Sequence, residues 1–175
     1  MPRFYTYLMS SLPSLQFGQK PPFSFERFLA LCSEFIPEPD SAVLRKLDLS
    51  YNPENFGKEI LKKIILFETC LRNEIARIRA GKRRIDASRY IRKEAVADLT
   101  LAHTLVSISR NTHPLETEKA LDKLRWDFLE ALSFGHYFDF EALLIYAYKL
   151  LILEKWEKID SADKKTLLAE VLNRR

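Results

Sequence analysis

The residue types that most often catalyse reactions or bind metals are few in this sequence and poorly spaced. Zinc sites usually place cysteines or histidines in close pairs, and no such pair occurs among Cys32, Cys70, His103, His113 and His136. Glu94 and Asp98 lie one helical turn apart, a spacing that acid–base catalysis can use. Solvent-facing carboxylates that pair with nearby arginines and lysines are the more ordinary interpretation. We therefore expect a non-enzymatic protein with no catalytic residue, no bound metal and no cofactor.

Glycine motifs for phosphate binding are also missing. Phosphate-binding loops need glycines because backbone N–H groups must approach the phosphates closely, and neither GxGxxG nor GxxxxGK[ST] occurs. The chain has only four glycines in 175 residues. Sandwiches, barrels and nucleotide-binding α/β folds need more glycine turns than this, so a helical protein is favoured.

Positive charge is concentrated in residues 72–93. This segment has nine basic and two acidic residues, a net charge of +7, whereas the whole chain carries +4. A cationic segment favours an anionic partner, namely an acidic protein surface, lipid headgroups or nucleic acid, and a solvated helix hairpin explains the charge equally well. Nucleic acid is disfavoured because Tyr90 alone is available for base stacking. The predicted interaction residues are Arg77, Lys82, Arg83, Arg84, Arg89, Arg92 and Lys93.

The elements that position these residues follow from the apolar pattern, which predicts an all-α helical bundle of six to seven helices. The first 23 residues allow a short strand or a turn of helix over 4–8. Ser24 can cap a helix that ends before Pro37. Asp40 or Ser41 can cap a short successor that reaches about residue 47.

The longest apolar stripe predicts a helix over residues 53–80, for which Gly81 suits the C-terminal cap. A basic connector leads to a helix over about 86–110, broken near Tyr90. Pro114 opens the next helix, and Gly135 marks its end.

The last part of the chain predicts one very apolar helix. Asp139 can cap a helix through about Ile159, and Ser161 can cap a final one. In residues 140–153, 12 of 14 residues are apolar, counting tyrosine. A transmembrane helix needs about 20 apolar residues, so we interpret this stretch as a buried helix that is central to the fold or meets another protein on one side. With no signal-peptide pattern at the N-terminus, we expect a cytoplasmic protein.

These patterns fit a single helical domain over residues 1–175, with a subdivision near 81–93. The helices form either one bundle or two packed helical hairpins.

Two stretches of the sequence resemble a known family. One is Tyr5-Thr6-Tyr7-Leu8 with Ser11-Leu12-Pro13, and the other runs from the LDKLRWDFL segment at 121–129 through the HYFDFEALL segment at 136–144 to Trp156. Together they resemble an uncharacterised bacterial family whose genes lie among those of V/A-type ATPase subunits. The middle of the chain is similar mainly in helical character.

The resemblance implies a subunit or assembly factor of a rotary ATPase, with stalk or rotor subunits as partners. The all-helical central-stalk subunit that sits on the membrane rotor ring would be its analogue, although this chain is much shorter. Peripheral association with the cytoplasmic face of the membrane through that complex is part of this expectation. The alternative is a helical protein that binds nucleic acid or another anion through residues 72–93. We expect an aromatic cluster to hold the C-terminal helices together: Trp126, Tyr137, Phe138, Phe140 and Trp156.

Overall fold

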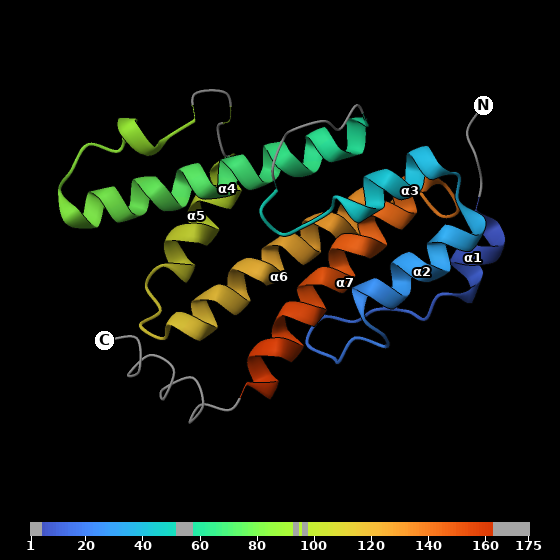
Figure 1. Cartoon of the computed structure of the whole chain (residues 1–175). Coiled ribbons are helices and arrows are strands. Elements are labelled where there is room, and N and C mark those ends of the chain that lie inside the picture. The colour runs from blue at the N-terminus through green and yellow to red at the C-terminus, as the bar shows by residue number, and fades with distance from the viewer. Residues whose placement is uncertain (1–4, 52–57, 93–94, 96–97, 163–175) are drawn as a thin grey trace, which may run out of the picture. The chain divides into compact units, whose positions relative to one another are not determined.

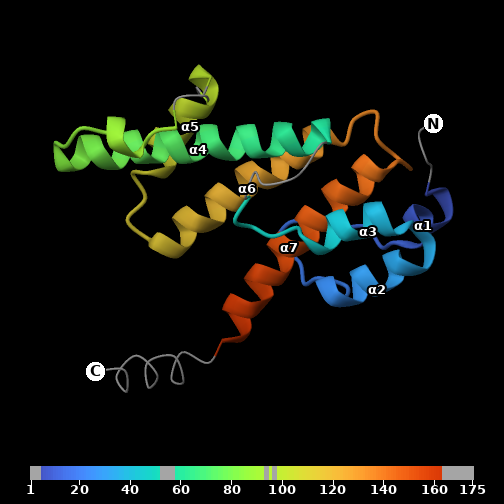
Figure 2. The same cartoon turned by 45° about the horizontal axis from the view of Figure 1, so that its top comes forward.

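The computed structural model describes residues 5–51, 58–92, 95 and 98–162. Within these ranges the protein has seven α-helices, one short 3₁₀-helix and no β-strand, which confirms the all-α prediction (Figures 1 and 2). The helices are α1 (Thr6–Ser11), α2 (Phe25–Phe35), α3 (Glu38–Arg45), α4 (Glu59–Arg83), α5 (Leu99–Ile108), α6 (Pro114–Leu132) and α7 (Phe140–Ser161), and the 3₁₀-helix η1 is Ser88–Tyr90.

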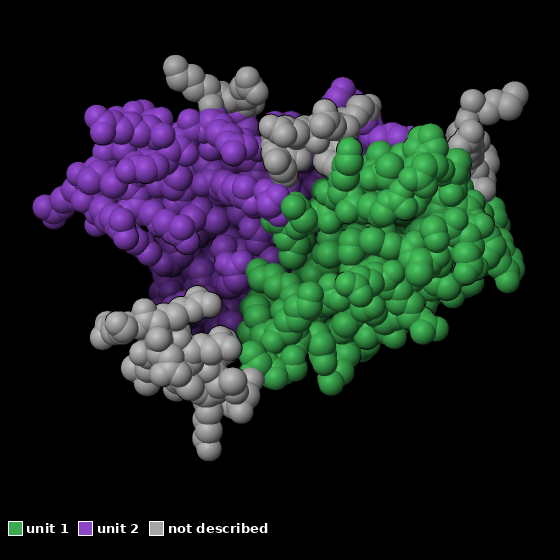
Figure 3. Space-filling model, viewed as in Figure 1, with its two compact units in different colours: residues 1–49, 136–175 green, residues 50–135 purple. Residues whose placement is uncertain are grey.

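The chain divides into two compact units, coloured separately in Figure 3. Unit 1 consists of residues 1–49 and 136–175, and unit 2 consists of residues 50–135. Helices α1, α2, α3 and α7 therefore belong to unit 1, while α4, η1, α5 and α6 belong to unit 2. The basic segment 72–93 lies wholly inside unit 2.

Helix α7 forms the centre of unit 1, as its apolar composition predicted. Leu143, Leu144 and Leu150 are fully buried, and both α2 and α3 contact α7. The ring of Phe28 on α2 is itself fully buried and stacks on Tyr146 of α7 at 5.4 Å between centroids. A helix that is apolar all round must be surrounded by other elements, and α2 and α3 supply part of that cover.

Unit 2 is built from α4, α5 and α6, each of which contacts the other two. Leu71, Leu105 and Leu121, one from each helix, form its buried apolar cluster. The rings of Phe67 on α4 and Phe128 on α6 stack in parallel with centroids 4.0 Å apart. These contacts fix α4 and α6 side by side, which matters for the polar residues between them.

Two predicted N-terminal helix caps are confirmed, and one is wrong. Ser24 accepts a hydrogen bond from the Arg27 N–H at 3.2 Å, and Asp139 accepts one from the Ala142 N–H at 2.9 Å. Helix α3, however, begins before Asp40 and Ser41, with Pro37 at the N-cap. A proline in the first turn has no N–H that needs a partner, so the prolines of this segment start the helix instead of delaying it.

The long helix α4 passes through Gly81, where the sequence predicted its cap, and ends two residues later. Arg84 adopts the left-handed conformation at the C-cap with φ 55°. Its N–H donates to the Gly81 carbonyl at 3.2 Å, and the Ile85 N–H donates to the Ala80 carbonyl at 3.1 Å. Because Ala80 is buried, packing continues the helix past the position that the glycine favoured.

The other boundaries differ in smaller ways. The predicted helix over 86–110 is broken more widely than expected, because only η1 and α5 are helical in its described part. The start predicted at residue 53 and the helix predicted after Ser161 fall outside the described residues. No helix in the described ranges is both long and apolar enough to cross a membrane.

Candidate functional site

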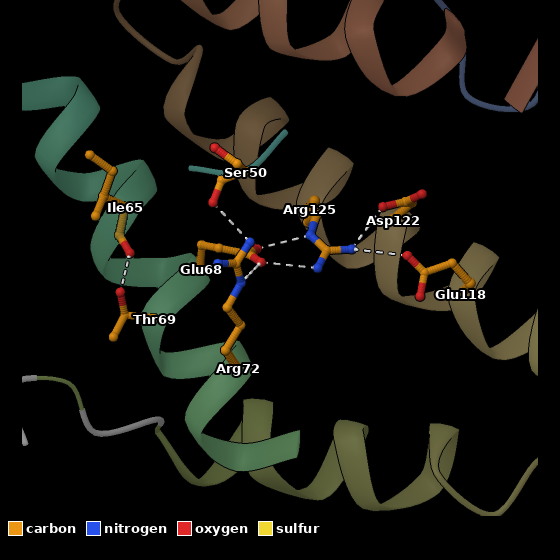
Figure 4. A network of polar contacts seen from close by, with 8 residues as sticks. All are labelled: Ser50, Ile65, Glu68, Thr69, Arg72, Glu118, Asp122 and Arg125. Carbon is orange, nitrogen blue, oxygen red and sulfur yellow. Dashed lines mark hydrogen bonds and ion pairs between the residues drawn. The ribbon is translucent and has the colours of Figure 1, made fainter. Parts of the chain in front are cut away.

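A buried carboxylate at the centre of unit 2 joins α4 to α6 (Figure 4). Glu68 on α4 is only 2% exposed. Its Oε2 accepts from Nε of Arg125 at 2.9 Å, and its Oε1 accepts from Nη2 of Arg125 at 3.1 Å. Nε of Arg72, one turn further along α4, donates to the same Oε1 at 2.6 Å. A buried charge is tolerated only when it is paired and hydrogen-bonded, and two guanidinium groups meet that need here.

The guanidinium of Arg125 is bound on its other side by residues of its own helix. Nη1 donates to Oδ1 of Asp122 at 2.8 Å and lies 4.0 Å from Oε1 of Glu118. Burial alone would lower the pKa of Arg125, but the hydrogen bonds and charge of Glu68 outweigh it and raise that pKa above its ordinary value. Arg125 therefore stays charged and is held by partners on both helices.

These two arginines line a pocket of unit 2 whose volume is about 490 Å³. That volume lies within the range of small-molecule sites. The lining combines four arginines and Glu118 with the side chains of Ile75, Ile85 and Leu121. The four arginines are Arg72, Arg79, Arg83 and Arg125.

Arg79 and Arg83 differ from the other two arginines of the pocket. They lie one turn apart on α4, and both are exposed. Neither guanidinium forms a hydrogen bond or ion pair with another described residue. Arg125 donates to Glu68 and Asp122, and Arg72 donates to Glu68 and to the Ser50 carbonyl. Arg79 and Arg83 therefore supply the donors that a ligand could use.

The residues predicted to form the interaction site fall into different surroundings. Arg77 pairs with Glu74 on the same helix at 2.8 Å, and Nζ of Lys82 donates to the Ser109 carbonyl at 2.6 Å. Of the six predicted interaction residues in the described ranges, only Arg83 lines the pocket of about 490 Å³. Four more predicted residues follow along the chain: Arg84 at the α4 C-cap, Arg89 in η1, Arg92 after it, and Lys93, which lies outside the described residues.

Asn73 fixes the path of the chain beyond η1. Its side chain is 1% exposed, and Nδ2 donates to the carbonyls of Arg92 at 2.7 Å and Ala95 at 2.9 Å. Oδ1 accepts from the Arg92 N–H at 2.9 Å. The side-chain amide of Asn73 thus makes three hydrogen bonds to backbone groups beyond η1. These bonds anchor the end of the basic segment to α4.

Glu68, Asp122 and Asn73 were not predicted from the sequence, although the two acidic residues each carried a signal. Glu68 follows Phe67 and lies four residues after Ile64, on the apolar stripe of α4. Asp122 follows Leu121 and lies four residues before Trp126, among apolar residues of α6. A polar residue on an otherwise apolar helix face is expensive to bury, and its presence there indicates a buried partner.

The aromatic residues predicted to form one cluster are distributed over both units. Trp126 is buried in unit 2, and Phe140 and Trp156 are buried in unit 1. Tyr137 is 62% exposed and Phe138 is 41% exposed. The carbonyl of Phe138 nevertheless accepts a hydrogen bond from the Tyr5 N–H at 2.5 Å, which ties the start of α1 to the segment before α7.

One group of side chains in unit 1 has the residue types that bind metals. His136, Asp139 and Glu141 each offer one ligand atom, and these atoms lie within 4.8 Å of one another. Nδ1 of His136 and Oδ2 of Asp139 are 2.5 Å apart, while Oδ1 of Asp139 accepts the cap hydrogen bond from Ala142. Capping of α7 therefore accounts for the position of Asp139 without a metal.

The two cysteines are free and buried in different units. Burial raises the pKa of the Cys32 thiol to about 12. The pKa of the Cys70 thiol is also raised, first by burial and then by the charge of Asp98. Thiols in this state are poor nucleophiles, which gives no support for cysteine catalysis.

Comparison with known proteins places the chain in a family. No curated protein and no solved structure matches it. One family does match, over residues 52–174, and its description is "Protein of unknown function (DUF2764)". That range covers all of unit 2 except its first two residues and most of the unit 1 segment containing α7. The chain therefore belongs to the DUF2764 family.

Proposed function

We propose that this protein is a non-enzymatic helical subunit or assembly factor of a V/A-type rotary ATPase. It acts in the cytoplasm through protein–protein contacts with stalk or rotor subunits, at the cytoplasmic face of the membrane. The link to the ATPase rests on the resemblance of the two end segments described above. The contact surface rests on the charges of unit 2.

The observation that carries the contact surface is a set of exposed arginines without partners among the described residues. The side chains of Arg83, Arg84 and Arg89 are exposed and form no hydrogen bond or ion pair with another residue in that part of the chain. Arginine is suited to interfaces because its planar guanidinium binds carboxylates in a bidentate manner. An acidic protein surface would supply carboxylates for these groups.

The test is recovery of partners from the native host. Tagged protein would be isolated under mild detergent, and its partners would be identified and quantified by mass spectrometry. Stoichiometric recovery of stalk or ring subunits supports the proposal, and recovery of no ATPase subunit overturns it.

Charge reversal then locates the surface. Arg83→Glu with Arg84→Glu should abolish recovery of the ATPase subunits, because it replaces attraction to an acidic partner by repulsion. The matched control reverses two exposed cations elsewhere, Arg27→Glu on α2 and Lys63→Glu near the start of α4. Equal recovery of the ATPase subunits by both double variants would show that Arg83 and Arg84 do not belong to the interface.

Nucleic-acid binding is a second proposal, and the same exposed arginines favour it. Tyr90, 64% exposed, lies directly after Arg89 and could stack on a base. Binding through phosphate contacts must weaken steeply as salt rises. A filter-binding titration that detects no complex at low ionic strength would eliminate this function and leave the ATPase proposal intact.

A further inference from the structure

The pocket lined by Arg72, Arg79, Arg83 and Arg125 adjoins a second, smaller pocket of unit 2 with a different lining. This pocket has a volume of about 130 Å³. It shares Ile75, Arg79 and Leu121 with the larger pocket, so the two meet at these side chains. The rest of its lining consists of three apolar side chains from α4 and α5, Ile78, Leu105 and Ile108, and of Lys82, Ser109 and Thr117.

Together the two pockets place charge and apolar surface next to each other. At the larger pocket, the guanidinium groups of Arg79 and Arg83 have donors without a partner among the described residues. In the smaller pocket, the apolar side chains leave space that water would fill at a free-energy cost. A ligand that matches both must carry an anionic group and an apolar body in one molecule.

We propose that this site binds a small amphipathic anion, an organic phosphate or carboxylate with a short apolar chain. The anionic group binds Arg79 and Arg83, and the apolar chain enters the smaller pocket beside Ile75 and Leu121. Arg72 and Arg125 add positive charge at the larger pocket, but all three nitrogens of Arg125 already bind Glu68 or Asp122, and Arg72 binds Glu68 and the Ser50 carbonyl. Specific binding therefore depends on the pair from α4.

The lining of the larger pocket agrees with this ligand charge. Its four arginines outnumber its single carboxylate, Glu118, which lies near Arg125 at 4.0 Å. Because charge-assisted hydrogen bonds from arginine favour phosphate and carboxylate oxygens, a neutral or cationic ligand is disfavoured. This inference concerns a ligand of the isolated chain and does not rest on the proposed ATPase partner.

The experiment is isothermal titration calorimetry of the full chain with three probes. Octyl phosphate, below its micelle concentration, carries both features of the ligand. Inorganic phosphate carries only the charge, and octyl glucoside carries only the apolar chain. We expect octyl phosphate to bind at least about tenfold more tightly than either of the others, because only it uses both parts of the site.

Two variants separate the contributions. Arg79→Gln should weaken octyl phosphate binding about tenfold or more, the loss expected for a charge-assisted hydrogen bond. Ile108→Asn, at a partly buried apolar side chain of the smaller pocket, should weaken octyl phosphate binding and leave inorganic phosphate binding unchanged. The control Lys63→Gln removes an exposed cation about 24 Å along α4 and should change neither.

Three outcomes would overturn the proposal. Equal affinity for octyl phosphate and inorganic phosphate would reduce the site to a simple anion contact. Equal affinity for octyl phosphate and octyl glucoside would mean that the arginines take no part. An Arg79→Gln variant that melts like the wild type and binds octyl phosphate with unchanged affinity would place any binding elsewhere.

Discussion

Glu68 and Arg125 are 57 positions apart in the sequence, yet two hydrogen bonds join the carboxylate of one to the guanidinium of the other. The first charge is 2% exposed, and the second has a side chain 14% exposed. Replacement of one partner by methionine leaves the other buried with fewer partners. We expect Glu68→Met or Arg125→Met alone to lower the free energy of unfolding by about 3–5 kcal/mol, measured by urea denaturation.

The double variant tests whether the two residues act together. Because it removes both charges, its loss should be smaller than the sum of the single losses by about 0.5–3 kcal/mol. Asp127→Asn is the control, since it breaks the exposed Lys123–Asp127 pair on the same helix, which should cost about 1 kcal/mol or less. Strictly additive losses would show that Glu68 and Arg125 are not coupled.

Asn73 is expected to control local opening of the chain after η1. Asn73→Leu keeps the approximate size of the side chain but removes all three hydrogen bonds to Arg92 and Ala95. The amide hydrogen of Arg92 should then exchange with solvent at least about tenfold faster, because a lost hydrogen bond to a buried group costs about 1–3 kcal/mol. Hydrogen–deuterium exchange measures this directly.

The matched control for this exchange experiment is Asn111→Leu. Asn111 is exposed and donates to Glu116 at 2.9 Å, so its loss should leave exchange at Arg92 unchanged. Equal protection of the Arg92 amide in wild type and Asn73→Leu would contradict the anchoring role.

Gly81 and Gly135 should respond in opposite directions to alanine. Gly81 lies inside α4, and a Cβ placed there meets nothing within 4 Å. Gly81→Ala should therefore raise the free energy of unfolding by about 0.5–1 kcal/mol. Gly135 has equally open surroundings but a φ of +86°, so Gly135→Ala should lower stability by about 1 kcal/mol. Thermal melts that move in the same direction for both variants would refute the difference in backbone conformation.

Trp126 tests the apolar core of unit 2. The residue is 5% exposed, so Trp126→Ala should lower the free energy of unfolding by about 3–5 kcal/mol. Phe134, 86% exposed in the same unit, provides the control, and Phe134→Ala should change stability by about 0.5 kcal/mol or less. A melting curve unchanged by Trp126→Ala would reassign this side chain to the surface.

Cys32 should make unit 1 sensitive to alkaline pH. Burial raises the pKa of its thiol from 9.0 to about 12, so on raising the pH the unfolded chain loses this proton first. The contribution of this thiol to the free energy of unfolding is constant below pH 9. It falls between pH 9 and 12, by up to about 1.4 kcal/mol per pH unit. The stability difference between wild type and Cys32→Ala should stay constant from pH 6 to 8 and shift in favour of the variant above pH 9. Parallel stability curves up to pH 11 would contradict the raised pKa.

Local sequence patterns determined most of the helical content. Ser24 and Asp139 could be recognised as caps because a side-chain oxygen satisfies a free N–H within three residues, which is a property of the sequence alone. The apolar composition of 140–153 likewise predicted that α7 would be buried, since nothing else keeps so much apolar surface from water. The family resemblance of the C-terminal half also needed only the order of its residues.

Tertiary packing decided what local patterns could not. Gly81 favoured the end of a helix, but α4 continues past it because Ala80 is buried. The free energy of this packing exceeds the small helix-propensity penalty of one glycine. Arg125, which binds Glu68 from α6, and the backbone partners of Asn73 lie 19 to 57 positions away in sequence, beyond any local spacing rule. The sequence showed that residues 72–93 are basic. Only the structure showed which of these cations are paired and that Arg79 and Arg83 are not paired with described residues. Pairing depends on which side chains the helices bring within a few ångströms of one another.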